Sequence, residues 1–283
     1  MRIIEISIPH FTPSGTFAEA ISEMNAIAND GFDVVFLMPI LPINKGLSKS
    51  PYAVTAFDQL NADLGTWDDW LRWLNACHRL GLNVVLDLPL NHTSPAHEWV
   101  GREGFYRMDA LGKMHPPMGT NWDDVVQLNH DSAEVGKELM RVIRFWLATG
   151  VDGFRYDAAA FIPKGELQQL IRFADDIAER RLFHWCDSLE LFNQIEGMSA
   201  YFDHEGVKRL RSGEALKGVL SHSSEERILY LANHDTLHQY GSVISQWGDR
   251  HTELRDALLH EQVNFMQTFA EWRDPSARYS FLD

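Results

Sequence analysis

The chain is poor in cysteine and in positive charge. It has 283 residues but only two cysteines, Cys77 and Cys186, so no disulfide framework is implied and a reducing, cytoplasmic compartment is the simplest expectation. Lys and Arg number 25 against 40 Asp and Glu, which gives a formal net charge of −15. Because phosphate groups are bound by cationic patches, this deficit argues against nucleic acid or an anionic membrane as a partner and favours a neutral substrate.

Long apolar runs are also missing. No stretch is long enough to span a bilayer, and the N-terminus enters a strand-like run without the apolar core of a signal peptide. The hydrophobic content of 45% still supports a large buried core. We find no internal repeat and no boundary of a second domain, so residues 1–283 are predicted to form one domain, a length normal for an α/β barrel.

Strand-like and helix-like patterns alternate along the chain, which indicates a parallel sheet covered by helices. The predicted strands lie at 3–8, 34–38, 84–88, 153–157, 182–186, 200–202 and 228–232. The longest irregular stretch, about 91–130, follows the third strand and is rich in Gly, Pro, Asp and Trp. A long loop after the carboxyl end of a barrel strand is more often functional than a linker.

Three of the predicted strands end in ionisable residues. Arg155 and Asp157 stand two positions apart in the run Gly-Phe-Arg-Tyr-Asp, so they point to the same side of a strand, where the Arg can hold the Asp ionised as a nucleophile. Asp87 and the pair Asn91-His92 follow the third strand, and Asn233-His234-Asp235 follows the seventh. Acids and histidines gathered at the carboxyl ends of strands are typical of a (β/α) barrel active site.

These motifs resemble those of the α-amylase family, glycoside hydrolase family 13, over residues 1 to about 261. Asp87 with Asn91-His92 is similar to the first family motif, 153–157 to the second and 233–235 to the fourth. The resemblance implies a TIM-type (β/α)8-like barrel with an insertion at about 91–130. It also implies retaining hydrolysis or transglycosylation of α-glucosides, with a carbohydrate as the partner.

The resemblance also implies roles for single residues. Asp157 is expected to be the nucleophile and Arg155 to position it, while Asp87 supports both. Asp235 is expected to bind substrate hydroxyls and to stabilise an oxocarbenium-like transition state. The remaining substrate-binding residues expected are His92 and His234, which would hydrogen-bond the sugar, and Tyr52, which would stack beneath it.

The third family motif, which supplies the general acid/base Glu, is altered. Strand alignment places Asp187 in that position, one methylene shorter than Glu, and Glu190 is the alternative. A misplacement of about 1 Å can cost about 10²-fold in rate. A retaining enzyme needs its two carboxyls about 5–5.5 Å apart, so the placement of this acid decides whether the site is active.

The C-terminal part departs further from the family. Residues Thr252 to Phe269 are predicted to form one amphipathic helix, and neither an eighth strand with a Gly-Asp-Glu-like end nor a C-terminal β domain is recognisable. The barrel is then expected to be incomplete, closed by Tyr279 to Leu282, or closed by a partner chain. Since an open barrel exposes strand edges, a homo-oligomer is one expectation.

The remaining expectations concern the substrate class, metal binding and the aromatic residues of the long loop. Ala160-Phe161 stand where many amylases have Lys-His contacting the sugar, which leaves the substrate class broad. No cofactor is expected. Many family members bind Ca²⁺ between Asn91 and the insertion, but the oxygen ligands Asp109, Asp123 and Asp124 lack EF-hand-like spacing. Trp99, Trp122 and Phe105 are expected to form a small core within the long loop.

Three functions remain open. The first is a retaining α-glycosidase acting on α-linked glucosides or glucooligosaccharides, able also to transglycosylate. The second is a catalytically impaired relative that binds sugar or serves in assembly, suggested by the short acid and the missing strand. The third is another sugar-acting barrel, a phosphorylase or isomerase.

Overall fold

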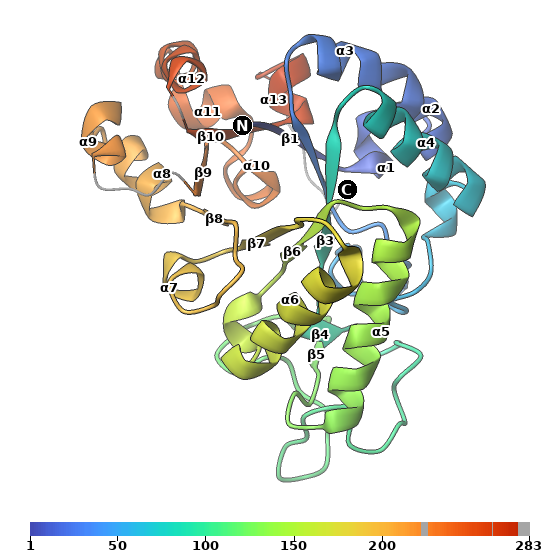
Figure 1. The fold of residues 1–283 in the computed structure, drawn as a ribbon. Helices are drawn as coiled ribbons and strands as arrows, with labels where there is room; N and C mark the ends of the chain where they lie inside the picture. The colour runs from blue at the N-terminus through green and yellow to red at the C-terminus, as the bar shows by residue number, and fades with distance from the viewer. Residues whose placement is uncertain (222–225, 262, 277–283) are drawn as a thin grey trace.

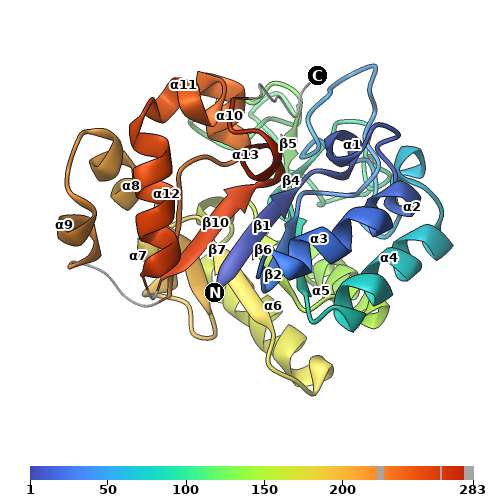
Figure 2. The same cartoon turned by 90° about the horizontal axis from the view of Figure 1, so that it is seen from above.

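A closed parallel barrel organises the chain, with helices around it (Figures 1 and 2). The computed structural model describes residues 1–221, 226–261 and 263–276. Neighbouring strands pair in the order β1-β10-β9-β8-β7-β6-β3-β2, and β2 closes the ring on β1. The barrel strands are β1 Arg2–Ile6, β2 Val34–Leu37, β3 Asn83–Leu88, β6 Gly153–Tyr156, β7 Phe183–Cys186, β8 Ala200–Phe202, β9 Arg227–Tyr230 and β10 Asn264–Thr268. The predicted TIM-type fold is therefore confirmed.

The helices pack their apolar faces against the barrel. In three longer ones, α4 Trp67–Arg79, α5 Ala133–Thr149 and α6 Lys164–Ala178, Leu and other apolar side chains are buried on one face. α4 starts with a capping box between Thr66 and Asp69. The first half of the chain contains α1 Ile8–Phe11, α2 Phe17–Ala20, η1 Ile21–Glu23, α3 Met24–Asn29, η2 Ala62–Leu64, α4 Trp67–Arg79 and α5 Ala133–Thr149. The second half contains η3 Ala159–Phe161, α6 Lys164–Ala178, α7 Leu189–Phe192, α8 His204–Arg211, α9 Leu216–Leu220, α10 His234–Tyr240, α11 Val243–Trp247, α12 Arg250–His260 and α13 Phe269–Arg273.

The prediction of one helix over 252–269 is wrong. α12 ends at His260, and β10 then pairs in parallel with β1 and β9, with Phe265 opposite both Arg2 and Leu229. The strand was hidden because a strand buried on both faces has no alternating pattern, and its polar Gln267 is buried too. β10 is followed by Phe269-Ala270-Glu271, which shares only the final Glu with a Gly-Asp-Glu end.

The barrel therefore closes through its own eighth strand. Neither a partner chain nor residues 279–282 is needed for closure, and that segment lies outside the described residues. The argument for a homo-oligomer from open edges no longer applies, because closure pairs each barrel strand on both sides.

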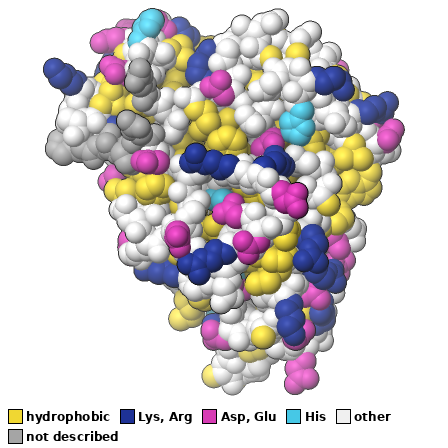
Figure 3. All heavy atoms as spheres, in the orientation of Figure 1, with side chains coloured by type: hydrophobic (Ala, Val, Ile, Leu, Met, Phe, Trp, Pro, Cys, Tyr) yellow, Lys and Arg dark blue, Asp and Glu magenta, His cyan; other side chains and the backbone are white. Residues whose placement is uncertain are grey.

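The stretch at 91–130 forms a subdomain on the side of the barrel mouth. Its two short strands, β4 His92–Thr93 and β5 Val126–Gln127, pair antiparallel. Trp99 and Phe105 are buried with ring centroids 5.5 Å apart, as expected, but both belong to the hydrophobic core cluster that includes the barrel strands, and Trp99 also packs against Phe57 at a centroid distance of 5.0 Å. On the face seen in Figure 3, basic side chains are scattered among acidic ones and do not form one patch.

Candidate active site

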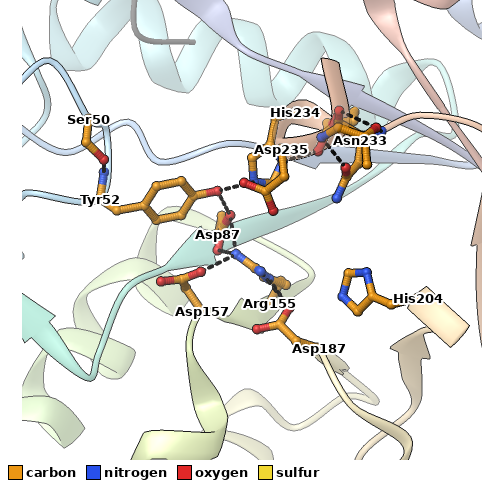
Figure 4. Close-up of polar contacts among 12 residues, drawn as sticks. Ser50, Tyr52, Asp87, Arg155, Asp157, Asp187, His204, Asn233, His234 and Asp235 are labelled. Carbon is orange, nitrogen blue, oxygen red and sulfur yellow. Dashed lines mark hydrogen bonds and ion pairs between the residues drawn. The ribbon is translucent and has the colours of Figure 1, made fainter. Parts of the chain in front are cut away.

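Arg155 is the centre of the site (Figure 4). It lies on β6 directly opposite Asp87 on β3, and its side chain is 8% exposed. One guanidinium nitrogen, Nη1, lies 2.9 Å from each carboxylate oxygen of Asp87 and 2.8 Å from Oδ1 of Asp157. The same-side placement of Arg155 and Asp157 predicted from their spacing is what the structure shows.

Asp157 sits immediately beyond β6, at the mouth of the barrel. Its backbone N–H donates to the carbonyl of Leu88 at 3.1 Å, which ties the residue to the end of β3. The next residue, Ala158, has a φ of 50°, a left-handed conformation that a non-glycine residue rarely adopts. The chain thus turns sharply after Asp157, and strain of this kind is often found beside functional groups.

Asp187 follows β7 and contacts the other end of the same guanidinium. Its Oδ1 accepts from Arg155 Nε at 3.0 Å and from Nη2 at 2.5 Å. Glu190, the alternative acid, is on α7; its side chain is 78% exposed and lies 4.0 Å from Lys164. Between the two carboxyls considered for the third motif, only Asp187 reaches the cluster.

A buried hydrogen-bonded chain runs from Asp87 to β1. The hydroxyl of Tyr52 donates to Asp87 Oδ2 at 2.9 Å and lies 2.8 Å from His234 Nε2, while His234 Nδ1 lies 2.6 Å from Glu5 Oε1. Glu5 is 2% exposed. Sequence reasoning missed Glu5, although a single acid inside the apolar run of the first strand was an available signal.

His92 and Asp235 complete the predicted set. His92 is buried, with its Nε2 4.0 Å from Oδ2 of Asp157. Asp235 is at the start of α10, its side chain 60% exposed and its Oδ1 3.6 Å from Nε2 of His234. All eight site residues predicted from the sequence therefore gather at one mouth of the barrel.

A cavity of about 330 Å³ opens over these residues. Its lining also includes residues that were not predicted as part of the site, among them Trp122 and His204. Trp122 is 36% exposed, so the expectation that it belongs to the small loop core is wrong. Its ring packs edge-on against Phe161, at a centroid distance of 5.6 Å, and 5.5 Å from the ring of His92. Phe161, which stands where many amylases have His, thus supports an aromatic wall.

Burial and neighbouring charges shift the pKa values of the clustered residues, often in opposite directions. Burial raises the pKa of Asp157 and of Asp87, and Arg155 only partly opposes this. Burial lowers the pKa of His92 to about 4. Burial also acts to lower the pKa of His234, but Asp235 and Glu5 outweigh it and raise this pKa to about 9. Near neutral pH His92 is then neutral and His234 cationic.

Several oxygen atoms considered for Ca²⁺, those of Asp109, Asp124 and Asn91, accept hydrogen bonds within the protein. Asp109 Oδ1 accepts from two backbone N–H groups of its own turn at 2.8 and 2.9 Å, and Asp124 accepts from Ser48 Oγ. Asn91 Oδ1 accepts from the amide of Gln127 at 3.4 Å. Within the described ranges no group of three or more His, Cys, Asp or Glu is arranged to hold a metal.

A barrel with carboxylates and histidines clustered at the carboxyl ends of its strands is an enzyme-type α/β barrel. The family model described as "Alpha amylase, catalytic domain" matches residues 10–108 and 121–222, more than half of the chain. The chain belongs to the α-amylase family.

Sequence relatives agree with this assignment, and a solved structure shares the fold. The chain is 32% identical over 182 residues to an α-1,4-glucan:maltose-1-phosphate maltosyltransferase of Arcanobacterium haemolyticum, covering 56% of this chain and 26% of that protein. It is 28% identical over 225 residues to a cyclomaltodextrin glucanotransferase of Geobacillus stearothermophilus, covering 69% and 31%. The fold is similar to that of an α-amylase from Lactobacillus plantarum, with a TM-score of 0.84, 18% identity, and coverage of 100% and 74%.

The chain spans about a quarter to a third of the length of these curated relatives. Over the described part of the chain, no helix combines the length and apolar character needed to cross a membrane.

Proposed function

We propose that this barrel is the catalytic unit of a retaining α-glycosidase that acts on α-linked glucosides or glucooligosaccharides. The observation that supports it is the single guanidinium of Arg155, which contacts Asp157 at one end and Asp187 at the other. Two carboxyls on one planar group are compatible with the spacing of about 5–5.5 Å that retaining glycosidases need.

The reaction would proceed by double displacement. Asp157 attacks the anomeric carbon as the glycosidic bond breaks, and a glycosyl-enzyme ester forms. Asp187 serves the leaving-group side of that bond, where a proton must be given to the departing oxygen and later taken from water. When a sugar hydroxyl replaces water in the second step, the same site transfers the glycosyl unit, and hydrolysis becomes transglycosylation.

The surrounding residues would bind the sugar. Asp235 projects into the cavity from the opposite side and is suited to accept hydrogen bonds from sugar hydroxyls. His92, kept neutral by burial, and cationic His234 offer two different hydrogen-bonding groups beside it. Tyr52 presents its ring at the cavity wall while its hydroxyl is held by Asp87 and His234. An aromatic ring held in one orientation suits stacking against a sugar.

The names of the relatives support α-glucans as the substrate class. They include a maltosyltransferase and a cyclomaltodextrin glucanotransferase, so transfer and hydrolysis both belong to the proposal. The proposal includes no cofactor. A reducing, cytoplasmic compartment is also proposed, since both cysteines are free and buried.

The experiment is turnover of maltooligosaccharides and of an aryl α-glucoside by the wild type and by Asp157→Asn. This substitution keeps the shape of the side chain and removes the nucleophile, so the rate should fall on the order of 10⁴-fold or more. The reagent 2-deoxy-2-fluoro-α-glucosyl fluoride should form a covalent adduct with the wild type but not with Asp157→Asn. Mass spectrometry would detect this adduct. Full activity in the mutant would disprove the assignment.

A second candidate is a sugar-binding relative without catalysis. The observation behind it is that Asp187 Oδ1 already accepts two hydrogen bonds from Arg155, which leaves that oxygen no role as a proton donor. Calorimetric binding of maltooligosaccharides, with no turnover even of α-glucosyl fluoride, would favour this candidate. Fluoride needs no protonation to leave, so the assay isolates the nucleophile.

A further inference from the structure

His204 lies where two cavities meet. It is the first residue of α8, directly after β8 and the N-cap residue Asp203. The cavity above Asp157 and a neighbouring groove of about 600 Å³ share two described lining residues, Asp187 and His204. The groove continues past them between Leu189 and Tyr240, whose side chains are exposed. A glycosidic bond held over Asp157, with its leaving group in the groove, would pass between Asp187 and His204.

The imidazole of His204 is anchored on one side only. Its Nδ1 forms a short hydrogen bond with the hydroxyl of Tyr230, a residue that is 2% exposed. Within the described parts of the chain, Nε2 has no hydrogen-bond partner. Figure 4 shows the ring on the Asp187 side of the Arg155 cluster. A ring fixed through Nδ1, with Nε2 available, can give or take a proton at Nε2.

Asp187 needs such a partner. Its Oδ1 is an acceptor for two N–H groups of Arg155, and its side chain is one methylene shorter than the Glu of the family motif. His204 is the neighbouring group whose ordinary pKa lies closest to neutral pH. Burial lowers the pKa of His204 and Arg155 acts in the same direction, while the charges of Asp187 and Asp235 oppose this shift without cancelling it. An anion beside the ring favours its protonated form.

We propose that His204 handles the proton on the leaving-group side of the reaction, with Asp187 as its anionic partner. In the first step the proton on Nε2 moves to the leaving oxygen as the bond to the anomeric carbon breaks and the Asp157 ester forms. In the second step water attacks that carbon, the ester breaks, and a proton of the water returns to Nε2. Atoms and charges balance over the two steps, and the inference rests on the proposed glycosidase function.

The test compares leaving groups. His204→Ala and His204→Gln are assayed with a phenyl α-glucoside, which needs acid assistance, and with a dinitrophenyl α-glucoside, which does not. We expect kcat/KM on the phenyl substrate to fall about 10²–10⁴-fold, the usual worth of general acid–base catalysis, and on the activated substrate by no more than about tenfold. His204→Gln preserves much of the side-chain size but does not titrate. His238→Ala is the matched control, because His238 is exposed on α10 and lines neither cavity.

Two further readouts separate a chemical role from a structural one. Azide should accelerate turnover of the activated substrate by His204→Ala and yield a glucosyl azide, because azide attacks without a base. The pH profile of kcat/KM should lose its alkaline limb in His204→Gln. The groups facing the ring are Asp187, Arg155, Asp235 and Tyr230, with Lys208 on its own helix, and their titration remains in the variant.

The inference fails if both variants keep wild-type activity on the phenyl substrate, or if folded variants lose the same factor on both substrates. Folding is checked by thermal unfolding. If the wild type turns over no α-glucoside and no α-glucosyl fluoride, the proposed function fails as well. If Asp157→Asn is inactive while His204→Gln is unaffected, only the role of His204 is overturned.

Discussion

Arg155 and Asp87 are opposite each other on adjacent strands, and one guanidinium nitrogen lies 2.9 Å from both carboxylate oxygens. The same guanidinium contacts Asp157 and Asp187. A single buried cation thus contacts three acids and weakens their mutual repulsion. Its removal must affect the fold as well as the chemistry.

Arg155→Met should destabilise the fold strongly near neutral pH. It leaves buried carboxylates without their partner, a change that costs about 3–5 kcal/mol. The loss should be smaller at pH 5, where these carboxyls can be protonated. Urea unfolding at pH 5 and pH 7.5 measures both effects. Arg172→Met is the control, because Arg172 and Glu196 form an exposed pair expected to contribute about 0–1 kcal/mol.

Activity should decline on the acid side at an unusually high pH. Burial raises the pKa of Asp157 above its ordinary value of 3.8, and a nucleophile must be ionised to attack. As the pH falls through that raised pKa, the ionised fraction falls and kcat/KM falls with it. A pH profile with an activated aryl glucoside isolates this group. An acid limb at the ordinary carboxyl value would show that Arg155 outweighs burial.

Asp187→Asn and Glu190→Gln should behave differently. Asp187→Asn removes the anion on the leaving-group side, so hydrolysis of a phenyl glucoside should fall about 10²–10⁴-fold. Glu190 is exposed and outside the cavity above Asp157, so Glu190→Gln should change little. Steady-state kinetics of the two isosteric variants decide between them. A large loss of activity in Glu190→Gln, with little loss in Asp187→Asn, would instead assign the acid role to Glu190.

The pair Glu5–His234 should make stability depend on pH. His234 has an ordinary pKa of 6.5, and its carboxylate neighbours raise it to about 9 in the folded state. The resulting stabilisation, to which Asp235 contributes more than Glu5, is complete below pH 6.5 and is lost as the pH rises through 9; from the shift it amounts to about 3–4 kcal/mol. Urea unfolding at pH 6, 7.5 and 9 should show this loss in the wild type. Glu5→Gln should show a smaller one, and equal losses would contradict the pairing.

Gly153→Ala should damage the barrel itself. A Cβ at Gly153 would lie 2.1 Å from the carbonyl oxygen of Phe183 on β7, a backbone atom that cannot move aside cheaply. Overpacking of this kind costs about 1–3 kcal/mol, and a backbone clash lies at the upper end or beyond. Thermal unfolding checks the effect. Gly165→Ala is the control, since a Cβ there meets nothing within 4 Å and Ala favours the helix α6.

Most of the site was predictable because its residues follow strands in short motifs. Residues two apart on a strand share a side, and parallel strands bring their carboxyl ends to one edge. Asp87, Arg155 and Asp157 could therefore be placed together before any coordinates. His204 carried no such signal, and Glu5 only that of a single acid in an apolar strand; neither could be joined to the site, because the partner of each lies far away in the sequence.

The sequence by itself determined the strand–helix alternation, the family and the candidate nucleophile, because these depend on local periodicity and on short motifs. Only the tertiary structure decided how the barrel closes, since β10 is recognisable through its pairing with β1 and β9 and not through its own pattern. It also showed that Asp187, and not Glu190, contacts Arg155. Which of the two carboxyls contacts Arg155 depends on how the chain turns after β7. Asp187 and Glu190 are three positions apart, and this spacing alone does not specify the turn.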